Sequence, residues 1–188
     1  MAQTINKILL SFLTAILLTG CVTKPSNNEV ILTHDAQTRF NATGKLGIRS
    51  TDLAESARFM WSQDNAQYTV ELVDPFGRQV MQLSGDQYIA LLKFKDEHYR
   101  ATSPEELMER LLGWTLPVSH ALYWIQGHPD PDSLFNKISN DQFEQAGWLI
   151  SILGSTTLNN GETAPRKLKL QNRDLTLTLI VSKWEFPQ

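Results

Sequence analysis

Apolar and polar residues alternate with a period of two from Thr43 to about Phe94, and this pattern constrains the fold more than any other feature of the chain. Successive side chains of a β-strand point to opposite faces, so the alternation predicts strands with one apolar face. These strands are separated by short breaks rich in Asp, Asn, Pro and Gly, at Asp64-Asn65, at Asp74-Pro75-Phe76-Gly77 and at Gly85-Asp86. Short connections of this kind join antiparallel neighbours, so we expect a meander.

Strand patterns return in the last third of the chain, from Phe143 to Leu153, at Leu168 and Leu170, and from Leu175 to Val181. The run from Tyr88 to Leu92 differs from the others because it is apolar on both faces. We therefore expect both faces of this run to be covered.

Two short helices are predicted in the middle of the sheet. Ser103-Pro104-Glu105-Glu106 places a capping hydroxyl and a helix-starting proline before an apolar stripe, and Gly113 is positioned to end that helix. Pro117 precedes a second helix, expected from about Val118 to Gln126. A further short helix is indicated between Glu29 and Thr38 by apolar residues spaced one turn apart. Because no repeat or low-complexity tract interrupts the pattern, a single α+β domain over residues 29–188 is the simplest description.

The N-terminus has the organisation of a secretory leader. Residues 1–20 combine one charge, Lys7, with an apolar stretch of 11 residues from Ile8 to Leu18. That stretch is well short of the roughly 20 residues that a membrane-spanning helix needs. Without the leader, the remaining 168 residues carry a net charge of −4, which argues against a nucleic-acid partner held by phosphate contacts.

Cys21 is the single cysteine of the chain, so it cannot form an internal disulfide. The sequence Leu18-Thr19-Gly20-Cys21 resembles the lipobox of bacterial lipoproteins. This resemblance implies cleavage before Cys21, a diacylglycerol on its sulfur and a fatty acid on its amine. Residues 21–28 then form a lipidated, flexible tether, and the absence of aspartate at Val22 implies sorting to the outer membrane. A secreted protein with a free thiol near its cleavage site is the alternative.

Motifs for catalysis and cofactor binding are missing from the sequence. It contains no Gly-x-Ser-x-Gly, no glycine-rich phosphate loop and no Cys or His pair with metal-ligand spacing. The four histidines are scattered along the chain, and Glu105 and Glu106 are explained by the first turn of a helix. We therefore expect no enzymatic activity, no cofactor and no metal.

A meander with one apolar face and two helices in its middle can form a curved sheet under a helical lid. Such a shape encloses an apolar cavity. The alternative is that the helices fill the concave side completely and the apolar face is ordinary core. The pattern alone leaves both open.

The helical segment carries a more specific signal. The stretches Leu112–Val118 and Leu122–Pro129, together with Asp74–Gly77 and the last strand ending near Trp184, resemble the outer-membrane lipoprotein LolB family. The resemblance implies an open, strongly curved antiparallel β-barrel with a helical lid over an apolar cavity. It also implies a monomeric, periplasm-facing receptor in the outer membrane of a Gram-negative bacterium, anchored by its own lipid. Such a receptor accepts lipoproteins from the carrier LolA and incorporates them into that membrane.

The resemblance also implies roles for individual residues. Phe76 corresponds to a protruding apolar residue that helps deliver acyl chains into the membrane. The alternative for Phe76 is a turn residue folded back on the sheet. Candidates for the cavity wall, any of which would serve equally as core, are Tyr68, Val70, Leu72, Met81, Leu83, Leu107, Leu111, Trp124 and Ile125.

Two other classes of function compete with lipoprotein transfer. An outer-membrane lipoprotein acting as a structural or assembly partner requires an exposed apolar face. A periplasmic hydrolase requires a polar cluster with perturbed ionisation in a cleft.

Overall fold

Antiparallel pairing joins all the strands of the domain into one sheet. The computed structural model describes residues 35–187. Its sheet has 11 strands in the order β6-β5-β4-β3-β2-β1-β11-β10-β9-β8-β7. The elements are β1 (Arg39–Arg49), β2 (Ala54–Asp64), β3 (Gln67–Val73), β4 (Gln79–Gly85), β5 (Ala90–Phe94), β6 (Glu97–Ala101), α2 (Pro104–Leu112), α3 (Val118–Trp124), β7 (Phe135–Lys137), β8 (Gln142–Gln145), β9 (Trp148–Thr157), β10 (Thr163–Gln171) and β11 (Thr176–Glu185).

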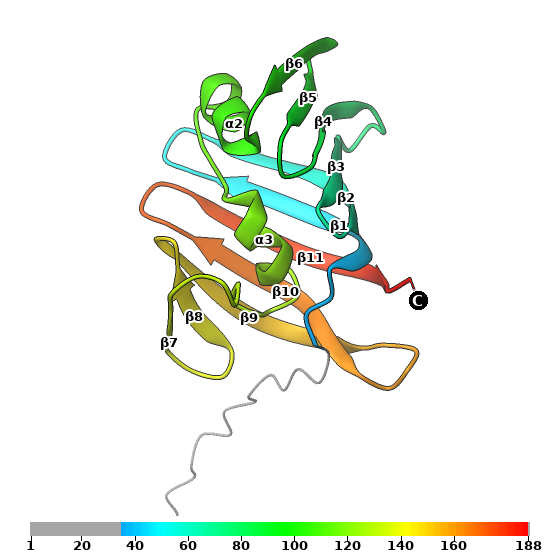
Figure 1. The fold of residues 1–188 in the computed structure, drawn as a ribbon, viewed down its shortest axis with the longest axis vertical. Coiled ribbons are helices and arrows are strands. Elements are labelled where there is room, and N and C mark those ends of the chain that lie inside the picture. Colours follow the sequence, from blue (N-terminus) through cyan, green and yellow to red (C-terminus); the bar gives the residue numbers. More distant parts are fainter. Residues whose placement is uncertain (1–34, 188) are drawn as a thin grey trace, which may run out of the picture.

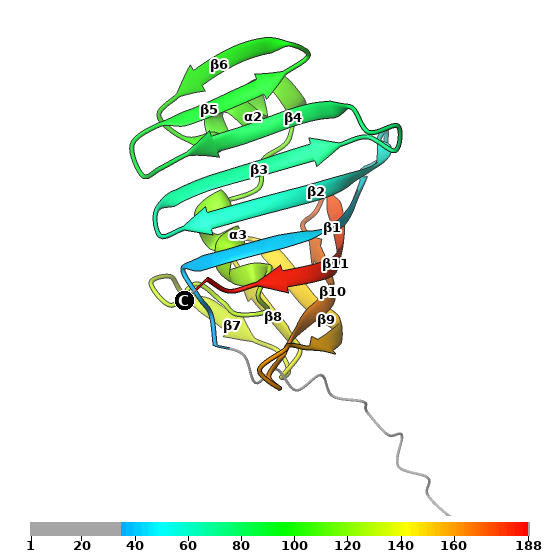
Figure 2. The same ribbon diagram turned by 90° about the vertical axis from the view of Figure 1, so that its right-hand side faces the viewer.

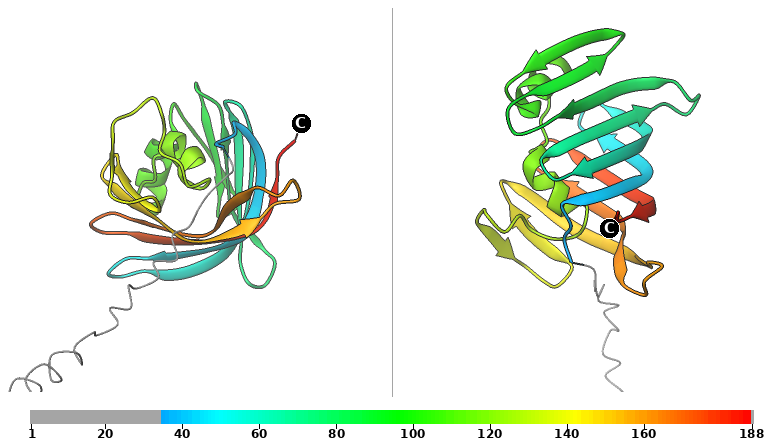
Figure 3. Two further views of the ribbon diagram at one scale, coloured as in Figure 1. Left: turned by 90° about the horizontal axis from the view of Figure 1, so that it is seen from below. Right: turned by 45° about the vertical axis from the view of Figure 1, so that its right-hand side comes forward.

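The sheet is strongly curved but does not close. Strands β6 and β7 form its two edges, and the chain passes from one edge to the other through α2 and α3. Figure 1 shows both helices lying across the concave side, and the view from below in Figure 3 shows the sheet curling around them. Figure 2 shows the outer side, where β1 to β6 form one continuous layer. The expected open, curved antiparallel half-barrel with a helical cover is confirmed.

Local sequence signals place most of the turns correctly. The β2–β3 connection contains Asn65 at φ 54, and the β3–β4 connection contains Gly77 at φ 90. One connection was not predicted. The expected strand from Phe143 to Leu153 is two strands, because Ala146 (φ 50) and Gly147 (φ 77) form a two-residue hairpin between β8 and β9.

The first predicted helix is confirmed in detail. The Ser103 side chain accepts a hydrogen bond from the Glu106 backbone N–H, and Gly113 ends α2 in the left-handed conformation at φ 72. The second helix, α3, ends at Trp124, two residues earlier than expected. The chain then turns through Gly127 at φ 82.

The expectation that both faces of the run from Tyr88 to Leu92 are covered is wrong. Tyr88 is 76% exposed and Leu91 is 44% exposed, whereas Ala90 and Leu92 are buried. Strand β5 lies one position from the open edge, and only its concave face is covered.

Several N-terminal predictions fall outside the described residues. These are the leader, Cys21, the tether and most of the helix expected between Glu29 and Thr38. Residues 35–38 are not helical, and regular structure begins at Arg39. Within the described range, no helix has the length and apolarity needed to cross a membrane.

Candidate functional site

An apolar cavity lies between the concave face of the sheet and the two helices. It is narrow in this conformation, with a volume of about 70 Å³. Its wall is made entirely of apolar residues, which are Leu46, Phe59, Trp61, Val70, Leu72, Met81, Leu83, Met108, Trp114, Leu116, Val118, Ala121, Ile125, Leu170, Leu177 and Leu179.

Strand register explains how the sheet builds this wall. Across β2, β3 and β4, one row of cross-strand neighbours is Phe59, Leu72 and Met81. A second row is Trp61, Val70 and Leu83. Both rows contain alternate residues of their strands, so all six side chains point to the concave face.

The structure brings together five of the predicted cavity residues. Val70, Leu72, Met81, Leu83 and Ile125 all lie at the cavity.

The other four predicted residues lie elsewhere. Leu107 and Trp124 are fully buried in the core, and Leu111 is half-buried against it. Tyr68 lines a separate pocket, most of whose residues are polar.

Sequence reasoning missed several residues of the wall. Phe59 and Trp61 alternate like Val70 and Leu72, so the period-two pattern contained the signal that would have found them. Trp114 and Leu116 lie in the connection between the helices, where no periodicity marks them.

The cavity has room for little more than water in this structure. A volume of 70 Å³ is about two water molecules, at about 30 Å³ each. The helices therefore fill most of the concave side in this conformation.

A hydrogen-bonded group of buried polar residues holds the end of α3 to β8. Gln145 Oε1 accepts from Trp124 Nε1 and from the Asp130 backbone N–H, both at 2.8 Å. Gln145 Nε2 donates to the carbonyl oxygens of Asp130 and Ser133. His120 Nδ1 lies 2.6 Å from Asp130 Oδ2. These contacts fix the C-terminal end of α3, whereas its cavity face makes apolar contacts.

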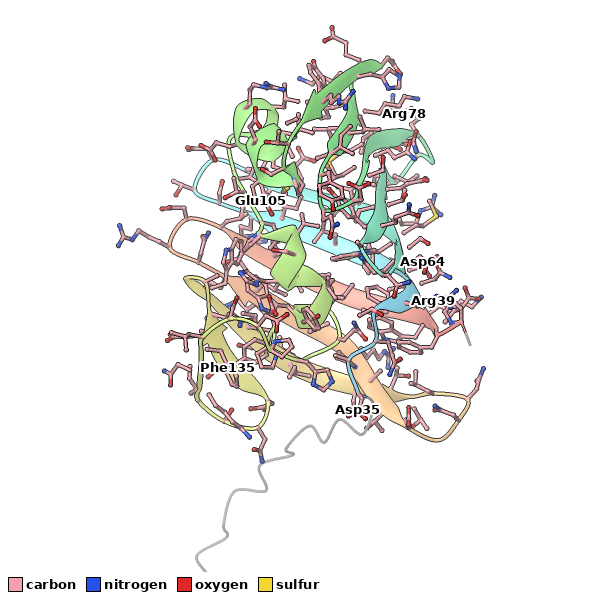
Figure 4. All side chains as sticks on the ribbon, viewed as in Figure 1. Asp35, Arg39, Asp64, Arg78, Glu105 and Phe135 are labelled. Carbon is pink, nitrogen blue, oxygen red and sulfur yellow. The ribbon has the colours of Figure 1, made fainter. Side chains whose placement is uncertain are left out.

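Phe76 lies at the tip of the β3–β4 turn and is 85% exposed. The Asp74 carboxylate shapes this turn, because its Oδ1 accepts from the backbone N–H groups of Phe76 (2.8 Å) and Arg78 (3.0 Å). Hydrogen bonds from the Arg78 backbone and side chain hold the pKa of Asp74 below its ordinary value of 3.8. Figure 4 labels Arg78 at this turn, where its guanidinium carbon lies 5.7 Å from the centre of the Phe76 ring.

Among residues 35–187, no group of three or more His, Cys, Asp or Glu side chains is arranged to hold a metal ion.

Comparison with known proteins identifies the family. The family model described as outer membrane lipoprotein LolB matches residues 38–184, which contain both helices and nearly the whole sheet. The chain belongs to the LolB family. The outer-membrane lipoprotein LolB of Pseudomonas putida (strain GB-1) is 39% identical over 149 residues, covering 76% of this chain and 72% of that protein. The LolB of Pseudomonas aeruginosa (strain LESB58) is 34% identical and covers 90% of this chain and 91% of its own.

A solved structure shows the same fold. The crystal structure of a LolA superfamily protein from Nitrosomonas europaea aligns with a TM-score of 0.50 at 10% sequence identity, covering 82% of this chain and 89% of that one. The predicted resemblance to the LolB family is confirmed by the family match and by these relatives. Membership makes the chain an outer-membrane lipoprotein of the Lol pathway in a Gram-negative bacterium.

Proposed function

We propose that this protein accepts lipoproteins from the periplasmic carrier LolA and incorporates them into the outer membrane. The observation that carries this proposal is the entirely apolar cavity between the curved sheet and the two helices. During transfer, this cavity holds the acyl chains of the client lipoprotein. The protein acts as a monomer and faces the periplasm.

The energetics of acyl chains explain why such a cavity is needed. A triacylated terminus has about 40 methylene groups, and exposing each to water costs about 0.8 kcal/mol, so the total is about 30 kcal/mol. Passing the chains from one apolar wall to another avoids most of this cost. The handover then requires only a difference in affinity between carrier and receptor.

The helices act as a lid in this proposal. The closed cavity of about 70 Å³ is too small for an acyl chain, so α2 and α3 must move away from the sheet when a client enters. Contacts between α3 and the cavity are apolar and non-directional, whereas the hydrogen bonds of Gln145 hold the end of α3 near Trp124.

Attachment to the membrane completes the proposal. Residues 1–20 are a lipoprotein signal peptide, Cys21 carries the acyl groups, and residues 21–28 are the tether to the domain at 29–188. Phe76 enters the bilayer interface and delivers the client's chains, which the exposure of its ring supports.

A transfer assay tests the proposal. The full mature chain, made without acyl groups by Cys21→Ala, is incubated with LolA that carries a labelled lipoprotein. We expect the label to move to the receptor. Absence of transfer by a folded receptor would refute the proposed function.

A second candidate function, that of an assembly partner, rests on exposed apolar residues at the β7 edge of the sheet. Leu134 is 98% exposed, and Phe135 and Ile138 are each 49% exposed around β7 (Figure 4 labels Phe135). If no label moves in the transfer assay and a Leu134→Glu variant loses a protein partner in the membrane, this candidate replaces the first.

A further inference from the structure

A second pocket adjoins the apolar cavity, and most of the residues that line it are polar. Its volume is about 310 Å³. Val118 lines both spaces, so the two are neighbours across the start of α3. The polar groups of the second pocket come from the adjoining ends of β2 and β3, from the β4–β5 connection and from the start of α2, and include Gln63, Tyr68, Asp86, Thr102, Ser103 and Glu105.

Strand register shows that the polar pocket continues the apolar wall along the same face. Gln63, Tyr68 and Gly85 are cross-strand neighbours on β2, β3 and β4. They form the next row after Trp61, Val70 and Leu83, two residues further along each strand, which is a distance of about 7 Å. This row adds two polar groups, the Gln63 amide and the Tyr68 hydroxyl, to the face, whereas its members on β1 and β5, Phe40 and Ala90, are apolar.

The Tyr68 hydroxyl is the unusual group in this row. Tyr68 is 8% exposed, and its hydroxyl is buried without a hydrogen-bond partner among the described residues. Gly85 gives it room, because a Cβ at position 85 would lie 2.8 Å from this oxygen and would overlap the Ile89 carbonyl. Burial raises the pKa of Tyr68, and the nearby charges of Glu105 and Asp86 raise it further. The hydroxyl therefore stays protonated.

The surrounding polar groups are already held in place. A Glu105 carboxylate oxygen accepts from the Val118 backbone N–H at 2.8 Å. Asp86 Oδ1 accepts from the backbone N–H of Tyr88 at 2.7 Å. Gln63 accepts from Trp61 Nε1 and donates to a backbone carbonyl. Because buried polar groups are nearly always paired, the single unpaired donor among these fixed neighbours indicates a missing partner.

We infer that this pocket binds the polar head of a client lipoprotein, the glyceryl ester and amide groups of its lipidated cysteine, while the acyl chains lie in the adjoining apolar cavity. Tyr68 donates to a carbonyl oxygen of the head, and the carboxylates of Glu105 and Asp86 accept from its amide N–H groups. This inference rests on the proposed function, because it assigns the head of the same client.

The arrangement also orients the client. Tyr68 is near the start of β3, whereas the Phe76 turn follows the end of that strand. The Phe59, Leu72 and Met81 row lies between them and faces the cavity. A client bound in this way directs its chains toward the Phe76 rim and keeps its head at the opposite rim.

The test compares two probes on Tyr68→Phe, again in the full mature chain made without acyl groups. One probe is a synthetic triacylated cysteinyl peptide, and the other is diphenylhexatriene, a hydrocarbon without a polar head. Loss of one neutral hydrogen bond weakens binding by roughly 2- to 12-fold. We expect that loss for the lipopeptide and unchanged affinity for the hydrocarbon. Folding is preserved, because removing an unpaired buried hydroxyl does not destabilise the protein.

The controls separate this inference from the proposed function. Tyr99→Phe removes a hydroxyl on β6 that is bonded to Glu97, outside both pockets, and is expected to bind both probes normally. Unchanged lipopeptide affinity in Tyr68→Phe, or an equal loss for both probes, overturns the head-group site and leaves the proposed function standing. If the unsubstituted protein binds neither probe, the proposed function fails and the head-group site fails with it.

Discussion

Replacing Phe76 with glutamate should block insertion of client lipoproteins while leaving the fold and client acceptance intact. The turn does not depend on the aromatic side chain, since Asp74 Oδ1 accepts the backbone N–H groups of Phe76 and Arg78. The substitution removes the packing of Arg78 over the ring, which is worth about 0.5–1 kcal/mol at an exposed site. For a domain of this size, the melting temperature should therefore fall by no more than about 4 °C.

The effect on membrane contact should be much larger. The ring is 85% exposed in the protein, so nearly all of its apolar surface is available to enter the bilayer interface. Burying a phenylalanine ring is worth about 2 kcal/mol, which corresponds to about 30-fold in partitioning. Glutamate loses this contribution and adds the cost of bringing a charge to the interface.

The assay separates acceptance from insertion. Labelled lipoprotein is first moved from LolA to the receptor, and vesicles of outer-membrane phospholipid are then added and recovered by flotation. We expect Phe76→Glu to accept the label normally and to deliver at least about 30-fold less of it. Leu134→Glu is the matched control, because Leu134 is 98% exposed but lies just before the edge strand β7, away from the β3–β4 turn. Normal delivery by Phe76→Glu, or equal loss in Leu134→Glu, would refute the role of Phe76.

Three further predictions concern stability and ionisation. Gly85→Ala should destabilise the domain by about 1–3 kcal/mol in urea denaturation, because the new Cβ overlaps the Ile89 carbonyl, whereas Gly154→Ala has free space and should be nearly neutral. Ser103→Ala should cost about 1 kcal/mol by the same measurement through loss of the α2 cap, and an unchanged unfolding midpoint would contradict that cap. Asp74 should titrate below pH 3.8 in carboxyl ¹³C NMR, because its hydrogen bonds favour the charged form. Its contribution to stability is thus present above pH 3.8 and lost as the pH falls through the lowered pKa, and a midpoint at or above 3.8 would contradict the turn geometry.

The elements that sequence reasoning predicted well are those decided by neighbouring residues. The cap at Ser103, the stop at Gly113 and the turn at Gly77 each depend on a few adjacent residues with special backbone or side-chain chemistry. The hairpin at Ala146-Gly147 was missed because Ala146 is not a typical residue at positive φ. The apolar positions do change phase across it, from Phe143 to Trp148 and Ile150, and Gly147 lies at the change, so the sequence contained a signal for this turn.

The burial and surroundings of some side chains were predicted wrongly because they depend on contacts between residues that are distant in sequence. The run Tyr88–Leu92 is apolar on both faces, but no element covers the outer face of β5, so Leu91 remains exposed. Tyr68 and Val70 share one face of β3, and the pattern treats them alike. Their surroundings differ because Glu105 and Asp86 lie near Tyr68, whereas apolar residues surround Val70.

The sequence by itself determined the strand meander, the two helices, the turn at Asp74–Gly77 and the family, because periodicity, caps and motifs are local properties of the chain. Only the tertiary structure decided that Phe76 is exposed, that the helices leave a cavity of about 70 Å³ on the concave side, and that a second pocket with mostly polar residues adjoins it. The physical reason is that a side chain's surroundings depend on what packs opposite it. In this protein, those partners lie far apart in the sequence: Leu46 and Leu170, for example, line the same cavity wall.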